Sequence, residues 1–194
     1  MSLDDPARAG AFPAALRHPQ ISLLGSVDKD MVEKLCGALK AAKPGEDLAI
    51  ELTTPGGDPE LARRMVLEIE MTRRTSGRRV LFLGKTQVYS SGVTFMAAFP
   101  RADRYLTRDA VLLIHARQLD ERVEISGPIR ASMPQVEGLC REFEMAMKLE
   151  EKNFRKLIEG SRVELDALLE KALYNWYVTA EEAEALGLIA GIVD

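Results

Sequence analysis

The chain has few of the residues that form metal centres and disulfide frameworks. Its 194 residues include two cysteines and two histidines. Cys36 and Cys140 lie far apart and without metal-ligand spacing, so we interpret both as reduced packing residues and expect a cytoplasmic protein. We expect neither a metal nor a cofactor. If the chemistry needs a histidine base, His18 and His115 are the candidates.

Long apolar runs and an excess of positive charge are also absent. No stretch approaches the roughly 18 apolar residues of a membrane span. The first residues carry neither the positive region nor the apolar region of a signal peptide, so we do not expect one. The balance of 26 basic against 30 acidic residues gives a net charge of −4. This charge argues against non-specific binding of nucleic acid and provides no basic anchor for a membrane surface.

Hydrophobic residues make up 46% of the sequence, which is enough for the core of one domain. We expect a mobile leader over residues 1–20, which show no periodic pattern, and a single domain over residues 21–194. Within that domain, short apolar runs alternate with amphipathic stretches of helical period. This alternation predicts βαβ units and a largely parallel sheet covered on both faces, which is the α/β class.

The element boundaries follow from turn and capping residues. The expected strands are residues 21–24, 47–52, 80–83 (stopped by Gly84), 104–107, 110–116, 121–125 and 188–193, and the expected helices begin at Asp28, Asp58 and Ser90. Capping boxes at residues 161–164 and 179–182 predict two more helices, the second ending at Gly187. A long charged helix over residues 134–159 lies outside the βα pattern. We interpret it as a subunit contact, with a plain surface helix as the alternative.

Three short stretches point to one site. Residues 55–57 (Pro-Gly-Gly) follow an expected strand, residues 90–92 (Ser-Ser-Gly) precede an expected helix, and His115 ends an apolar strand. A glycine pair can offer backbone N–H groups to an oxyanion, and a serine at a strand-to-helix turn can be a nucleophile with histidine as its base. Together the three stretches predict a serine hydrolase.

Each stretch also has an interpretation without chemistry. The glycine pair fits a plain strand-to-helix turn, and serine is common as a helix N-cap. The residues alone do not separate Ser90 from Ser91 as the nucleophile. His115 is either a catalytic base or a satisfied core residue, because an unpaired imidazole is costly to bury. We interpret His18, in the leader, as structural or idle.

In their order and spacing, the three stretches resemble the proteolytic subunit of the Clp protease, within the wider crotonase-like superfamily. The resemblance covers roughly residues 19–194, including the closing residues 179–189. It implies a ClpP/crotonase-like fold of repeated ββα units with a mostly parallel sheet and a long protruding handle helix, in a handle region of about residues 117–159. It also implies a serine endopeptidase acting on peptides or unfolded polypeptides, a homo-oligomeric ring (heptamer or tetradecamer) and a Clp ATPase as partner.

The resemblance assigns roles to five positions. Ser90 matches the nucleophile, the backbone N–H groups of Gly57 and Ser91 match the oxyanion donors, and His115 matches the general base. The third triad position, an aspartate in the family, is Asn175 here. An asparagine carbonyl can hold the imidazole but cannot stabilise the imidazolium with a full charge, so a slow or specialised hydrolase is expected.

Two further hypotheses remain. Asn175 motivates a non-catalytic Clp-like subunit that assembles with an active paralogue. A crotonase-like acyl-CoA enzyme shares an oxyanion hole of two N–H groups but needs no Ser–His pair. The segment after His115 also departs from the family, which usually has Gln-Pro and glycines where this chain has residues 116–120 (Ala-Arg-Gln-Leu-Asp).

Overall fold

A mostly parallel, seven-stranded sheet forms the centre of the computed structural model, which describes residues 12–43, 45–118 and 124–194. The strands follow the order β1-β2-β3-β4-β7, with β5 paired to β3 and β6 paired to β5. They are β1 (Ile21–Leu24), β2 (Leu48–Thr54), β3 (Val80–Tyr89), β4 (Arg104–Thr107), β5 (Val111–Ile114), β6 (Trp176–Thr179) and β7 (Gly191–Val193). All pairs are parallel except β5–β6. The predicted α/β class and largely parallel sheet are confirmed.

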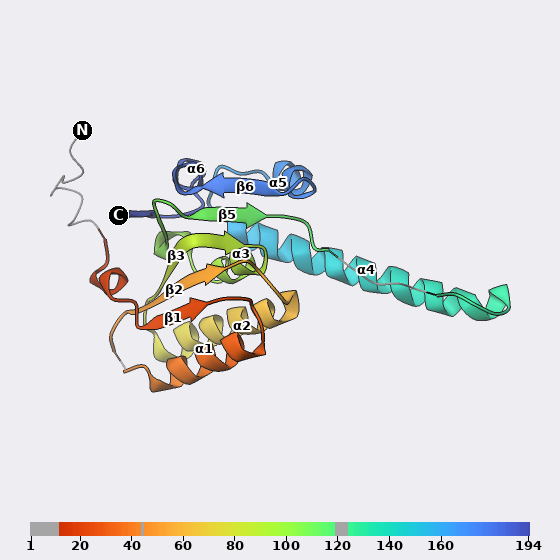
Figure 1. The fold of residues 1–194 in the computed structure, drawn as a ribbon, viewed down its shortest axis with the longest axis horizontal. Helices are drawn as coiled ribbons and strands as arrows, with labels where there is room; N and C mark the ends of the chain where they lie inside the picture. Colours follow the sequence, from red (N-terminus) through yellow and green to blue (C-terminus); the bar gives the residue numbers. More distant parts are fainter. Residues whose placement is uncertain (1–11, 44, 119–123) are drawn as a thin grey trace.

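Helices pack on one face of this sheet and bury the main apolar core. They are α1 (Lys29–Ala41), α2 (Pro59–Ser76), α3 (Ser91–Met96), α4 (Ile129–Ile158), α5 (Leu165–Ala172) and α6 (Ala180–Leu186). Figure 1 shows α1 and α2 side by side along β1 and β2. Their apolar side chains join those of the strands in one buried cluster that reaches from Ile21 to Ile189.

The opposite face of the sheet differs from the expectation. In the described part of the chain, a short 3-10 helix, η1 (Ala14–Arg17), packs there and no α-helix does. Leu16 is 2% exposed and lies in a small cluster with Leu81 and Tyr105, against which Phe12 also packs. Residues 12–17, expected to belong to a mobile leader, are therefore packed onto the sheet. Residues 1–11 lie outside the described residues.

β3 runs through Gly84 instead of stopping there, which corrects the predicted end of this strand. Leu52 pairs with Gly84 and Thr54 pairs with Val88, so β3 has three residues where β2 has one. Thr86 takes a left-handed φ of 55° inside this bulge, and Thr53 Oγ1 donates a hydrogen bond to the Lys85 carbonyl oxygen. The bulge is also where β3 changes partner, from β4 to β5.

α4 is a 30-residue helix that projects from the body (Figure 1). It begins five residues before the predicted start, with Pro134 inside its second turn. Phe154 and Leu157, near its C-terminal end, are its buried residues. Much of the rest exposes apolar side chains, including Ile129, Met133, Phe143, Met145 and Met147.

Capping residues set several helix starts. The Asp28 and Asp58 carboxylates accept hydrogen bonds at the first turns of α1 and α2, as the sequence indicates. Thr179 and Glu182 form the predicted capping box of α6, which ends at Gly187. The other predicted box is wrong: α5 has Glu164 as its N-cap without a side-chain bond. Ser161 Oγ instead accepts a hydrogen bond from the Val163 N–H.

The remaining findings concern the strand predicted at 121–125, the two cysteines and the length and apolar character of the helices. Residues 121–123 of the predicted strand at 121–125 lie outside the described residues, and residues 124–125 are exposed and not in a strand. Cys36 and Cys140 are free cysteines, but Cys140 is exposed and so is not a packing residue. None of the described helices combines the length and the apolar character that crossing a bilayer requires.

Candidate active site

The three stretches singled out in the sequence line one cavity at an edge of the sheet. The parallel strands β1, β2, β3 and β5 point toward the same edge in Figure 1, which is also where α4 leaves the body. Open α/β sheets bind ligands at the carboxyl ends of their strands. A cavity of about 290 Å³ lies here, and Gly57, Ser90, Ser91 and His115 are among its lining residues.

The glycine turn after β2 leaves one backbone donor unused. The Gly56 N–H donates to Thr54 Oγ1, and the Asp58 N–H donates to the Val27 carbonyl oxygen over 2.9 Å. Among the described residues, no hydrogen bond occupies the Gly57 N–H. This N–H belongs to a residue that lines the cavity, so it is available to an incoming oxygen atom.

Both glycines are required by the geometry. Gly56 and Gly57 have φ angles of 108° and 146°, in a region that residues with side chains rarely adopt. A Cβ atom on Gly56 would lie 2.8 Å from the Ser90 Cβ, and one on Gly57 would lie 2.7 Å from the Val27 nitrogen. The glycine turn therefore packs directly against the serine turn.

Ser90 occupies a strained position between β3 and α3. Its φ and ψ angles are 53° and −113°, a conformation that costs a non-glycine residue about 1–3 kcal/mol. Its N–H is held by the Leu113 carbonyl oxygen over 2.8 Å, and its side chain makes no N-cap hydrogen bond. The alternative interpretation of Ser90 as an ordinary N-cap is therefore wrong, and a half-buried hydroxyl lines the cavity.

Ser91 is the first residue of α3, and its side chain is engaged elsewhere. The hydroxyl is buried and donates a hydrogen bond to the Gly57 carbonyl oxygen over 2.8 Å. The first N–H groups of a helix have no partner within the helix. The Ser91 N–H thus belongs to the unpaired end of α3, next to Ser90, on the wall of the cavity.

His115 follows β5 directly and is half-buried at the cavity. Its Nδ1 lies 2.6 Å from the Ala116 carbonyl oxygen. A carbonyl oxygen only accepts, so in this contact Nδ1 carries the proton and donates it. Nε2 then has a free lone pair, which is the tautomer that a general base needs.

Asn175 lies directly before β6 and His115 directly after β5, but among the described residues no hydrogen bond joins their side chains. The antiparallel β5–β6 ladder ends with the pair Ile114 and Trp176, and beyond it the Ala116 N–H donates to the Ala172 carbonyl oxygen. Asn175 has a φ of 58° and is exposed. Within the described residues, no hydrogen bond involves its side chain. The Ala116 carbonyl holds the ring instead.

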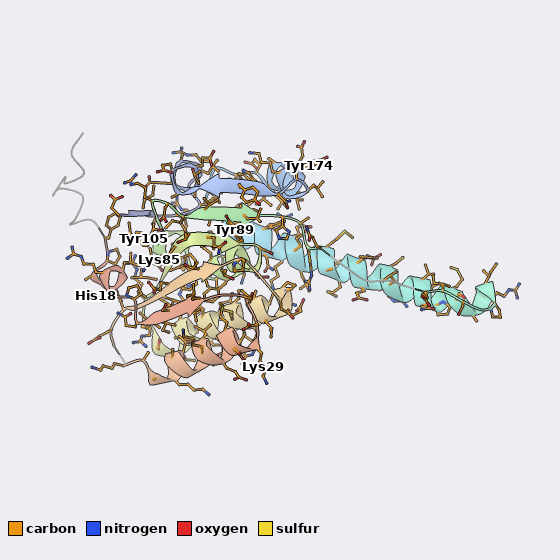
Figure 2. All side chains as sticks on the ribbon, viewed as in Figure 1. His18, Lys29, Lys85, Tyr89, Tyr105 and Tyr174 are labelled. Carbon is orange, nitrogen blue, oxygen red and sulfur yellow. The ribbon has the colours of Figure 1, made fainter. Side chains whose placement is uncertain are left out.

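An aromatic contact spans β5 between the strands on either side of it, β3 and β6. Tyr89 precedes Ser90, and its ring packs edge to face on Tyr177 of β6, with centroids 5.9 Å apart. Figure 2 shows Tyr89 on the sheet, whereas Tyr174, directly before Asn175, points outward from the layer of α5 and β6. Asp109, an acid that could orient His115 in place of Asn175, lies in the turn before β5, at the opposite end of that strand from His115, and accepts a hydrogen bond from Thr107.

The last turns of α4 form a wall of the cavity that the sequence did not assign. Glu150, Asn153, Phe154 and Leu157 line it together with Val93 and Ile114. Their spacing of three and four places them on one face of the helix, which is the signal that could have identified them. The cavity is therefore lined by both apolar and polar side chains.

A backbone hydrogen bond and an ion pair hold the segment that follows His115. The Glu150 carboxylate accepts a hydrogen bond from the Arg117 backbone N–H, and the Arg117 guanidinium pairs with Glu60 Oε1 over 2.7 Å. The hydrogen bond from Arg117 lowers the pKa of Glu60. This pair is intact at neutral pH and is lost as the pH falls through the lowered pKa. α2 and α4 thus hold the chain beside the imidazole.

Arg104 anchors the C-terminal end of α4. It is 2% exposed and donates hydrogen bonds to carbonyl oxygens of Phe99, Lys156, Leu157 and Leu188, with a longer contact to Ala97. Burial lowers the pKa of Arg104 to about 10, so it remains charged at neutral pH. Its guanidinium satisfies the carbonyl groups at the C-terminal end of α4.

The fold and the cavity define an α/β protein in which a serine, a histidine and unused backbone N–H groups line one cavity. The family model for Clp protease matches residues 8–194. The chain belongs to the Clp protease family.

Individual relatives agree with this membership. The chain is 25% identical over 175 residues to ATP-dependent Clp protease proteolytic subunit 3 of Rhizobium etli, covering 89% of this chain and 82% of the relative. The same protein of Rhizobium meliloti matches to the same extent. The solved structure of an asparagine-to-aspartate mutant of ClpP1 from Listeria monocytogenes superposes with a TM-score of 0.64 over 90% of each chain, at 15% identity. The last comparison confirms the ClpP fold.

Proposed function

We propose that this chain is a serine endopeptidase of the Clp proteolytic-subunit type, which cleaves peptides or unfolded polypeptides. The observation that carries the proposal is the meeting of four groups at one cavity. These are the strained Ser90, the His115 imidazole, whose Nδ1–H donates to the Ala116 carbonyl oxygen, and the backbone N–H groups of Gly57 and Ser91. Membership of the Clp protease family supports the same reaction class.

The reaction would proceed by acyl transfer. Ser90 Oγ attacks the peptide carbonyl while His115 Nε2 takes its proton, and the same nitrogen then gives that proton to the leaving amine. The N–H groups of Gly57 and Ser91 stabilise the oxyanion, and loss of one such donor typically costs about 3 kcal/mol. Water then releases the acyl group from Ser90, with His115 again as the base.

The projecting helix α4 supports an assembled form of the enzyme. Apolar side chains on its free part, such as Met133, Phe143 and Met147, are exposed in the single chain. Burying such surface against another copy is favourable. The proposal therefore includes a homo-oligomeric ring, as the family membership suggests, with a Clp ATPase as the partner that delivers substrate.

Active-site labelling tests the enzymatic part of the proposal. A fluorophosphonate probe should label the native protein, and the Ser90→Ala variant should remain unlabelled because the attacking oxygen is gone. Ser132→Ala removes an exposed hydroxyl from the first turn of α4 and should label like the native protein. Equal labelling of the native protein and Ser90→Ala would contradict the proposal.

A second candidate function follows from Asn175. No carboxylate occupies that position, and the Asn175 side chain makes no hydrogen bond among the described residues. The chain would then be a non-catalytic subunit that assembles with an active relative. This alternative predicts no labelling of the isolated protein but co-purification with a second ring-forming subunit. A homo-oligomer with peptidase activity would reject it.

A further inference from the structure

The Ser91 hydroxyl connects the two turns of the candidate active site. Ser91 is 3% exposed, and its Oγ donates a hydrogen bond of 2.8 Å to the Gly57 carbonyl oxygen. The bond joins the first residue of α3 to the glycine turn after β2, across 34 positions of sequence. In the proposed mechanism Ser91 contributes its backbone N–H, so the side chain has no assigned role.

Among the described residues, Thr54, Val27 and Ser91 hold the glycine turn by hydrogen bonds. Thr54 Oγ1 accepts from the Gly56 N–H over 3.1 Å and donates to the Gly56 carbonyl oxygen over 3.3 Å. On one side, the Val27 N–H donates to the Gly56 carbonyl oxygen over 2.8 Å, and the Val27 carbonyl accepts from the Asp58 N–H over 2.9 Å. On the other side, the Ser91 hydroxyl holds the Gly57 carbonyl. The peptide group between Gly57 and Asp58 is therefore bonded at both its oxygen and its nitrogen.

This restraint matters because glycine does not restrain itself. Gly56 and Gly57 have φ angles of 108° and 146°, and a glycine peptide group reorients at little steric cost. The direction of the Gly57 N–H thus depends on the Val27 N–H, which holds the oxygen of the same peptide group, and on the Ser91 hydroxyl, which holds the oxygen of the next one. Val27 fixes the turn relative to β1 and α1. Among the described residues, Ser91 alone ties the turn by a side-chain hydrogen bond to the turn that carries Ser90.

We infer that the Ser91 hydroxyl is a positioning group that locks the glycine turn against the nucleophile turn and aims the Gly57 N–H at the forming oxyanion. The inference rests on the proposed function. A donor fixed in place stabilises charge that develops in the transition state. Loss of the hydroxyl should therefore lower kcat, while KM, which reports peptide binding along the cavity, should change little.

Ser91→Ala tests the inference, because alanine is well tolerated in a first helical turn and removes only the hydroxyl. With a fluorogenic peptide, kcat should fall about 10- to 100-fold, and fluorophosphonate labelling of Ser90 should slow in parallel. KM should stay within about threefold. Ser91→Thr keeps the hydroxyl and should restore most of the rate, and Ser132→Ala should behave like the native protein. A Ser91→Ala variant with lowered thermal stability and native kcat would overturn the inference.

Hydrogen exchange provides a readout that needs no activity. The amides of Gly56 and Asp58 are hydrogen bonded in the native turn, and both should exchange faster in Ser91→Ala than in the native protein or Ser132→Ala. Native exchange rates in Ser91→Ala would show that no lock exists. Faster exchange in a protein that never labels at Ser90 would refute the proposed function and leave the lock in place.

Discussion

At the scale of single residues, a backbone carbonyl holds the candidate base. The Ala116 carbonyl oxygen accepts from His115 Nδ1, which orients the ring and selects its tautomer. A carbonyl dipole does not stabilise an imidazolium as well as a carboxylate does. The arrangement is therefore compatible with turnover but lacks the full charge that a triad aspartate supplies.

Asn175→Asp should increase the rate of peptide hydrolysis. Residue 175 lies one position beyond the Ile114–Trp176 pair that ends the ladder between β5 and β6, and a carboxylate close to His115 would stabilise the protonated ring. An aspartate-to-asparagine change in a serine triad can lower kcat by about 10⁴, so we expect the reverse change to raise kcat by at least about tenfold. Steady-state hydrolysis of a fluorogenic peptide measures it.

The matched control is Asn175→Ala. Because the Asn175 side chain makes no hydrogen bond among the described residues, its removal should leave kcat near the native value. A large loss of activity in Asn175→Ala would mean that the amide, and not the Ala116 carbonyl, orients His115.

Arg104→Met should destabilise the fold strongly. The substitution leaves several buried carbonyl groups at the end of α4 and along the adjoining loops without a donor. We expect a loss of at least about 3 kcal/mol in the free energy of unfolding. Guanidinium denaturation at one fixed protein concentration measures it. Arg155→Met, which removes an exposed pair with Glu151, should cost less than about 0.5 kcal/mol.

At the scale of elements, the bulge in β3 and the glycine turn after β2 determine where the candidate nucleophile lies. The bulge shifts the end of β3 relative to β2 and transfers its pairing to β5. Gly57 fits against Val27 without space for a side chain. The two turns therefore meet because both strands deviate from regular geometry at the same level of the sheet.

Gly57→Ala should abolish labelling of Ser90. A Cβ atom here meets the backbone of Val27, and the φ of 146° is unfavourable for alanine. Gly37→Ala is the matched control: it lies in α1 with open space around the new methyl group. It should label normally and stabilise the helix by about 0.5–1 kcal/mol. Normal labelling of Gly57→Ala would show that the turn can move without loss of the site.

Local signals predicted the elements well, and contacts between distant segments explain the failures. Asp58 and Thr179 cap helices through bonds to residues two or three positions away, so their sequence neighbourhood was sufficient. The path of β3 through Gly84 depends on pairing with β2 and β5, and no local pattern reports it. Proline is favourable in the first turn of a helix, so Pro134 suggested that the helix begins there. In the structure, α4 begins at Ile129.

The candidate site shows the same difference between local signals, which sequence reasoning detects, and contacts between distant segments, which it does not. The residue types of Gly57, Ser90 and His115 pointed to a serine hydrolase, and the structure gathers them at one cavity. The Ala116 carbonyl could not be recognised, since every residue has one. The Ser91 hydroxyl was visible, but its bond to Gly57 depends on how two distant turns pack.

At the scale of the whole molecule, α4 carries apolar surface away from the body (Figure 1). An exposed apolar stripe on a helix that leaves its domain indicates a partner surface. The long helix predicted as a subunit contact projects from the body with this surface exposed.

Replacing Phe143 and Met147 together by Glu should weaken assembly. The two side chains lie one turn apart on the free part of α4 and are 42% and 61% exposed. Two buried carboxylates would oppose burial of that stripe. Light scattering coupled to size exclusion should show a smaller particle than the native protein. Met145→Glu, about 200° around the helix from Phe143, is the control and should keep the native mass.

The anchoring of α4 gives the molecule a mechanical property. Its final turns line the cavity through Glu150 and Phe154, and Arg104 fastens its last carbonyls. The N-terminal end of α4 lies about 28 residues from that anchor, or about 42 Å at 1.5 Å per residue. A force applied to the free end would therefore reach the wall beside Ser90 and His115 through the same helix.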